Sequence, residues 1–199
     1  MKRRKLISLA LALPWLGACA GTRVQTGEVD SRGVGVVVEY HLAPGASKKM
    51  GISAIADEGY RLFGPARLSD RNGGTNQLGG ATVPHWVRVT WREGVDEAHG
   101  LYWTTGTVVG DYTVPVLERI PAEAFALARA GKNRYLVLSF RLRDDGVDFA
   151  WMIRLQEGAP FERLMNGGDF QAARMRNGKV VEKGWYIDKQ SGQKIETDY

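Results

Sequence analysis

The residues of this chain that could do acid–base chemistry are scattered along the sequence. Asp57 and Glu58 are adjacent carboxylates, and a pair of carboxylates can carry the acid and base roles of glycoside hydrolysis. The three histidines, His41, His85 and His99, lie in separate segments, without the HExxH spacing of a zinc site. We therefore expect no metal centre, and a solvated turn at the carboxylate pair.

Nucleophile and nucleotide motifs are incomplete. Ser53 lies in Gly-Ile-Ser-Ala-Ile, where a bulky Ile replaces the second Gly of the GxSxG nucleophile elbow. The segment 95–100, VDEAHG, spells a helicase-type Asp-Glu-Ala-His, but no GxxxxGK[ST] loop accompanies it. We expect no catalytic residues and no cofactor, hence no enzyme. A cryptic hydrolase built on Asp57, Glu58 and a histidine is the less favoured alternative.

The single cysteine, Cys19, follows a basic start and an uncharged segment. MKRRK carries four positive charges, and residues 6–18 carry none. A basic region, an apolar region and small residues together are typical of a secretory signal peptide. Thirteen residues are too few to span a bilayer, which takes about 20 as a helix.

The residues Leu16-Gly17-Ala18-Cys19 resemble the lipobox of bacterial lipoproteins. The resemblance implies cleavage between Ala18 and Cys19, a diacylglycerol on the Cys19 thiol, and no cofactor. Two or more acyl chains give stable membrane anchoring. By the same resemblance, Ala20 after the cysteine implies the outer membrane of a Gram-negative cell, with the mature body facing the periplasm.

Removing the signal changes the charge balance. The 27 Lys and Arg residues fall to 23, against 22 Asp and Glu, so the mature body carries a formal charge of about +1. Nucleic-acid binding requires clustered surplus positive charge, so no nucleic-acid partner is expected. No second cysteine is present for a disulfide.

We divide the chain into three parts. Residues 1–18 form the signal peptide, 19–33 the lipidated N-terminus and a flexible tether, and 34–199 a single β-rich periplasmic domain. At about 3.3 Å per residue, the tether spans roughly 45 Å when extended.

Gly-rich turns and β-branched or aromatic runs predict a mainly β fold, antiparallel and sandwich-like, or an α+β fold. One short helix is expected near 121–131, with Pro121 in its first turn, Gly131 after its end, and Phe125, Ala128 and Leu127 facing inward. Residues 51–64 are ambiguous between strand and helix, and 69–84 read as a surface loop. Strands are predicted at 35–42, 85–93, 101–109, 112–120, 134–143, 147–155, 170–176 and 179–187, with a last short one in the tail.

Three turns connect predicted strand pairs. They are Gly110-Asp111, residues 144–146 and Asn177-Gly178. Pro115 indicates an edge strand or a bulge. In 85–93, Val87, Val89 and Trp91 alternate with polar residues, which indicates one buried face.

The segment 83–140 adds a second resemblance. A Pro-x-Trp leads into a Trp-ending strand, followed by a loop, a strand with Val-Pro, an Ile-Pro and a short helix. This order is similar to small Gram-negative lipoproteins of undefined domain type, several of them encoded beside type VI secretion phospholipase effectors. Members often begin the segment with adjacent cysteines, where this chain has Ala81 and Thr82.

The resemblance implies an immunity lipoprotein that binds a toxin in the periplasm and blocks its active site. We expect a rigid β surface and a loop, 69–84 or 93–100, that enters the toxin cleft. The alternative is an envelope structural or assembly lipoprotein without a toxin partner.

Overall fold

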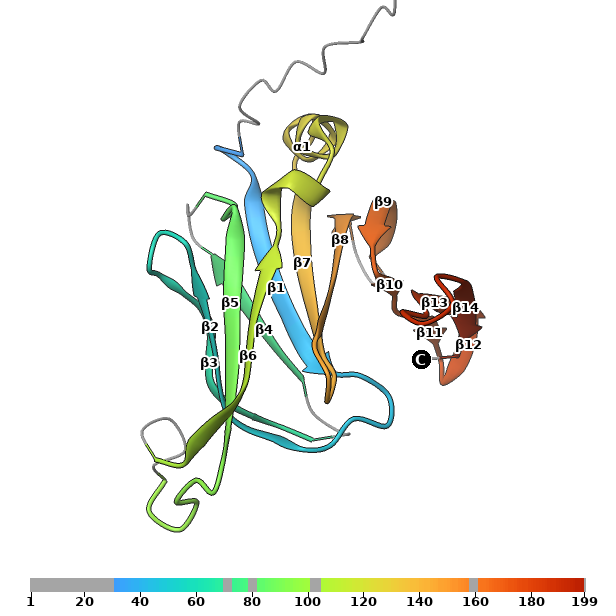
Figure 1. Ribbon diagram of the computed structural model, residues 1–199. Coiled ribbons are helices and arrows are strands. Elements are labelled where there is room, and N and C mark those ends of the chain that lie inside the picture. Colours follow the sequence, from blue (N-terminus) through green and yellow to red (C-terminus); the bar gives the residue numbers. More distant parts are fainter. Residues whose placement is uncertain (1–30, 70–72, 79–81, 101–104, 158–160, 199) are drawn as a thin grey trace, which may run out of the picture.

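The computed structural model describes residues 31–69, 73–78, 82–100, 105–157 and 161–198, and two sheets form the layers of its main body (Figure 1). The five-stranded sheet has the order β4-β1-β7-β8-β9 and the four-stranded sheet the order β3-β2-β5-β6. All neighbouring strands are antiparallel except β1 and β7, which are parallel. The expected mainly β, sandwich-like class is confirmed.

The bounds of the elements follow chain order. The first sheet contains β1 (Gly35–Leu42), β4 (Gly73–Leu78), β7 (Arg134–Leu142), β8 (Val147–Leu155) and β9 (Glu162–Gly168). The second contains β2 (Lys49–Ala56), β3 (Arg61–Leu68), β5 (Trp86–Glu93) and β6 (Thr107–Pro115). Between β6 and β7 lie the short helix η1 (Leu117–Arg119) and α1 (Ala122–Arg129).

The C-terminal part adds two small sheets beside β9 (Figure 1). One consists of β10 (Phe170–Gln171), β13 (Gly184–Ile187) and β14 (Lys194–Thr197), and the other of β11 (Arg174–Arg176) and β12 (Lys179–Glu182). The expected strand in the tail is therefore present as β14.

The core lies between the two large sheets. Because side chains alternate along a strand, each strand contributes every second residue to it. Fully buried side chains include Val38, Ile52, Phe63, Leu138, Phe140 and Phe149. Burying a large apolar side chain contributes roughly 1.5–3 kcal/mol, so this layer stabilises the sandwich and fixes which residues face outward.

Several expectations are confirmed at the level of single residues. Val87, Val89 and Trp91 are buried, and β6, which ends at Pro115, is an edge strand. Asn177 and Gly178 have φ values of 52° and 73°, as a type I′ turn requires, and connect β11 to β12.

The predicted helix and the hairpin turn at 144–146 are also confirmed. Phe125 and Ala128 are buried in α1 as expected. Ala124 joins them, while Leu127 is only half-buried, and Pro121 occupies the N-cap position just before the helix.

Two expectations about turns and loops are wrong. Residues 73–78 of the expected loop 69–84 form β4, because their backbone pairs with β1. The expected turn at Gly110-Asp111 lies inside β6, which pairs with β5 on both sides of a bulge at Val109. The position requires glycine because the ring of Trp91 lies where a side chain would be. A Cβ atom added to Gly110 would lie 2.0 Å from that ring.

Two segments differ in detail from expectation. The ambiguous stretch 51–64 is strand on both sides of a turn, as β2 and β3. The expected strand 170–176 is interrupted, because β10 pairs with β13 whereas β11 pairs with β12. No helix in the described ranges has the length and apolar character needed to cross a membrane.

Candidate binding groove

The outer face of the five-stranded sheet, turned away from the four-stranded sheet, carries polar side chains at central positions. While Val38, Leu138 and Phe149 point into the core, the alternate residues point outward. These include Glu39 and His41 on β1, Ser139 and Arg141 on β7, and Asp148 and Ala150 on β8.

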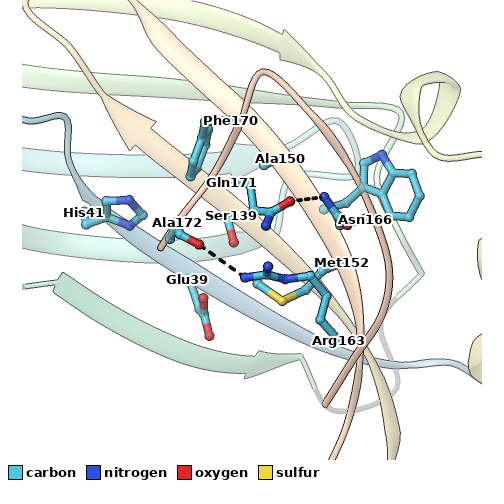
Figure 2. A pocket seen from close by; sticks show the side chains of 11 residues that line it. Glu39, His41, Ser139, Ala150, Met152, Arg163, Asn166, Phe170, Gln171 and Ala172 are labelled. Carbon is cyan, nitrogen blue, oxygen red and sulfur yellow. Dashed lines mark hydrogen bonds between the residues drawn. The ribbon is translucent and has the colours of Figure 1, made fainter. Parts of the chain in front are cut away.

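The C-terminal part forms a wall over this face (Figure 2). Phe170 and Gln171 of β10, with Ala172, stand opposite His41 and Glu39. Asn166 of β9 donates to Gln171 Oε1 at 2.7 Å. The wall and the sheet face enclose a small cavity of about 30 Å³, room for about two waters.

Polar contacts hold the wall in place. Arg163 Nη2 donates to the carbonyl oxygen of Ala172 at 3.2 Å, and its Nη1 donates to Glu182 Oε1 at 2.8 Å. Gln171 Nε2 donates to the same carboxylate oxygen at 2.7 Å, and the Trp185 indole donates to Gln171 Oε1 at 2.9 Å. A connected network of hydrogen bonds therefore fixes the position of the wall.

The small cavity adjoins a wider groove at the end of β1. The groove measures about 1000 Å³ and shares Glu39, His41, Phe170 and Ala172 with the cavity. The loop 43–46 forms its rim, and a second hollow of about 480 Å³ lies against the same loop, next to Arg141 and Tyr186. Both hollows are open to the surface, and each lies within the range of volumes that proteins use for ligands.

Arg141 and Asp148 form a buried ion pair at the base of the groove. Arg141 Nη2 lies 3.1 Å from Asp148 Oδ2. Burial lowers the pKa of Arg141, while the carboxylate of Asp148 acts in the opposite direction. The guanidinium also lies over the rings of Phe170 and Tyr186, at 4.1 and 5.6 Å from the centroids. These contacts join the sheet to the C-terminal part.

His41 is neutral at physiological pH. Burial and, secondly, the neighbouring Arg141 lower its pKa to about 4. Its ring lies edge-on to Phe170, with centroids 5.7 Å apart. An imidazole that stays neutral can accept or donate a hydrogen bond without adding charge to the groove.

The carboxylates around the groove are paired with cations. Glu39 Oε1 accepts from Arg154 Nη1 at 3.2 Å. Asp145 accepts from Arg143 Nε at 2.8 Å, and Asp144 accepts from Lys49 Nζ. The Asp144 carboxylate also accepts from the Ser47 backbone N–H at 3.1 Å. These pairs hold the 43–49 segment against the β7–β8 turn.

The Asp57–Glu58 pair lies elsewhere, in the turn between β2 and β3. Asp57 Oδ2 accepts from the backbone N–H of His85 at 3.2 Å, and Glu58 Oε1 accepts from Thr82 Oγ1 at 2.9 Å. Tyr60 donates to the carbonyl oxygen of Thr82, and burial followed by these two carboxylates raises its pKa to about 12. These bonds fasten the segment before β5 to the turn, and none of these residues lines the groove.

The three histidines stay apart from one another. His41 lies in the groove, His85 precedes β5, and His99 contacts Asp96 within the turn 96–100. Within the described ranges, no three His, Cys, Asp or Glu residues are grouped to hold a metal ion. Ala18 and Cys19, the predicted cleavage and lipidation residues, lie outside the described residues.

Sequence reasoning missed the groove. One signal was present: Glu39 and His41 alternate with apolar residues in the first strand, so they had to share a face. That Arg141 and Asp148 stand on the same face follows only from the pairing of β1, β7 and β8. No protein-family model, curated protein or solved structure matches this chain.

Proposed function

We propose that this chain is a lipid-anchored periplasmic binding protein, an immunity lipoprotein that neutralises a secreted phospholipase-type toxin of a type VI system. The lipobox-like Leu-Gly-Ala-Cys and the resemblance of residues 83–140 to immunity lipoproteins support this proposal. The groove on the outer face of the five-stranded sheet is the observation that carries it.

The groove has the chemistry of a binding surface. Its charged groups are engaged with one another, as in Arg141–Asp148 and Glu39–Arg154, and the neutral His41 sits between them. A partner loop that enters therefore meets a shape already set by ion pairs and by the wall at Phe170. Such preorganisation reduces the entropy lost on binding.

The rim extends the surface at this end of the sandwich. Lys48, next to the 43–46 loop, pairs with Glu97 of the 94–100 segment at 3.2 Å, and Arg67 of β3 lies 3.6 Å from the same carboxylate. In Figure 1 this end of the sandwich lies opposite the end that carries α1 and the start of β1. The expected loop 93–100 thus stays available as a contact, whereas 73–78 of the other expected loop is a strand.

The test is co-expression in the periplasm with the phospholipase-type effector encoded beside this chain. Binding measured with the purified pair, and survival of cells that export the effector, are the expected results. Absence of such a neighbouring gene product, or no binding and no protection, would contradict the immunity function and favour an envelope role.

A substitution in the groove locates the interface. Ala172 is exposed and lines the groove, so Ala172→Trp places a bulky ring in it. We expect at least a tenfold weaker affinity. Ala126→Trp on the exposed side of α1 is the matched control and leaves binding unchanged. Equal affinity of both variants would place the toxin on another surface while leaving the immunity function intact.

A further inference from the structure

The β11–β12 hairpin exposes three apolar side chains. Met175, Val180 and Val181 are 51%, 36% and 50% exposed. Met175 is paired with Val180 across the strands, so these two share one face, and Val181 occupies the bulge between this pair and the pair Arg174–Glu182. Two strands alone give neither face a covering layer, and Figure 1 shows the hairpin at the side of the molecule, beyond β9 and β10.

The tip of the hairpin is basic. Arg176 and Lys179 stand directly opposite each other on either side of the Asn177-Gly178 turn, and both are exposed. Like charges in directly opposed positions destabilise a strand pair. None of the described carboxylates lies within ion-pair distance of either cation. The arrangement is unfavourable for the free hairpin and favourable beside an anionic surface.

The base of the hairpin, in contrast, is fixed. Glu182 at the end of β12 accepts from Arg163 and Gln171, and Arg174 Nε lies 3.9 Å from the same carboxylate. The Arg163 side chain is almost fully buried. The exposed apolar side chains next to the tip are therefore presented by a rigid support.

We propose that the β11–β12 hairpin docks on the surface of an anionic lipid bilayer. The bilayer interface takes up the exposed side chains of Met175, Val180 and Val181. Its anionic headgroups neutralise Arg176 and Lys179. A second copy of this chain would bring two such basic tips together, which disfavours self-association.

The N-terminal segment brings the bilayer within reach. The sequence places the predicted lipid on Cys19, only 12 residues before the first described residue, Ser31. A segment of that length spans at most roughly 40 Å, so the body is confined near the membrane at a high effective concentration. Docking of the hairpin would then orient the groove relative to the surface on which a phospholipase acts. This inference rests on the lipid anchor of the proposed function and is independent of the toxin.

The experiment uses the full chain carrying Cys19→Ser, exported and purified without lipid. Flotation with phosphatidylglycerol/phosphatidylethanolamine vesicles is compared with neutral phosphatidylcholine vesicles. We expect binding to the anionic vesicles that is lost in high salt. Removing one tip charge, by Arg176→Gln or Lys179→Gln, weakens binding about fivefold. Val181→Asp weakens it more than tenfold.

Matched control variants separate an effect of the hairpin from a general effect of charge or hydrophobicity. Lys132→Gln removes an exposed charge near α1, and Val109→Asp changes an exposed valine on β6; both bind like the parent chain. Thermal melting verifies that each variant is folded. No binding to anionic vesicles, or equal binding by tip and control variants, would overturn the proposal. The proposal would also be overturned if the tip variants bound vesicles normally but no longer bound the toxin, or no longer formed a dimer seen with the parent chain.

Discussion

Arg141 and Asp148 lie opposite each other on β7 and β8, and their ion pair is buried beneath the ring of Phe170. The two residues are 5% and 2% exposed. Asp148 Oδ1 also lies 3.3 Å from Lys189 Nζ, so the carboxylate connects the sheet to a C-terminal residue. Both residues stay charged although they are removed from water, because the attraction between the two charges offsets the cost of their desolvation. The pair therefore positions the wall of the groove.

Removing one member of this pair is expected to be costly. Asp148→Asn leaves Arg141 buried without its counter-charge and should lower the free energy of unfolding by about 3–5 kcal/mol. Replacing both, with Arg141→Met and Asp148→Leu, should recover much of the loss. Urea unfolding of Arg141→Met, Asp148→Leu and the double variant measures the coupling. A cost below about 1 kcal/mol for Asp148→Asn would contradict this role.

His41 predicts a pH dependence of stability. Its pKa is about 4 in the folded chain, whereas the pKa of an unperturbed histidine is 6.5. The unfolded chain thus binds a proton first as the pH falls, so stability is lost between about pH 7 and pH 4. For one such group the loss from pH 7 to pH 5 is about 2 kcal/mol. The charged groups that line the cavity and the groove together with His41 are Glu39, Lys48, Arg141 and Arg163.

The measurement compares unfolding at pH 7 and pH 5. His41→Gln should remove most of the pH 5 loss, whereas His85→Gln, at an exposed position, should keep it. If the free energy of unfolding depends on pH in the His41→Gln variant as it does in the parent chain, other titrating groups cause the loss of stability.

A substitution at Gly110 tests whether its contact with Trp91 explains why β6 continues through the predicted turn. An added Cβ would lie 2.0–2.3 Å from the Trp91 ring, which stacks on Tyr112 at 5.1 Å between centroids. We expect Gly110→Ala to destabilise the fold by about 1–3 kcal/mol through overpacking and to alter the near-ultraviolet circular dichroism of Trp91. Thr113→Ala, exposed on the same strand, should do neither. A neutral Gly110→Ala would show that the tryptophan can move.

The local patterns of the chain predicted much of the fold. Alternation at 85–93 identified the buried face of β5, and Asn177-Gly178 identified the turn between β11 and β12, because each signal depends on neighbouring residues only. Gly110-Asp111 has the composition of a turn as well. What decides against a turn there is Trp91 on another strand, and no local pattern contains that contact.

The candidate site depended still more on distant contacts. β1 lies beside β7 in parallel, and 91 residues separate the end of β1 from the start of β7, so His41 and Arg141 become neighbours only through the finished sheet. The strand β4 was hidden for a related reason: its Gly-rich sequence has little strand propensity, and its backbone bonds to β1 determine its conformation. Pairing across the sheet overrides local preference in both cases.

Both the predicted tether and the proposed bilayer contact start from Cys19. If the Leu-Gly-Ala-Cys sequence directs lipidation, cells fed labelled palmitate should label this chain, and Cys19→Ser should abolish the label. The wild-type chain should sediment with membranes through two or more acyl chains. The Cys19→Ser chain should appear largely in the soluble fraction, with only salt-sensitive membrane binding from Arg176 and Lys179. Mass spectrometry of the mature N-terminus checks the cleavage after Ala18. An unmodified Cys19, or labelling that survives Cys19→Ser, would contradict the lipoprotein assignment and would remove the reason to expect a bilayer near the hairpin.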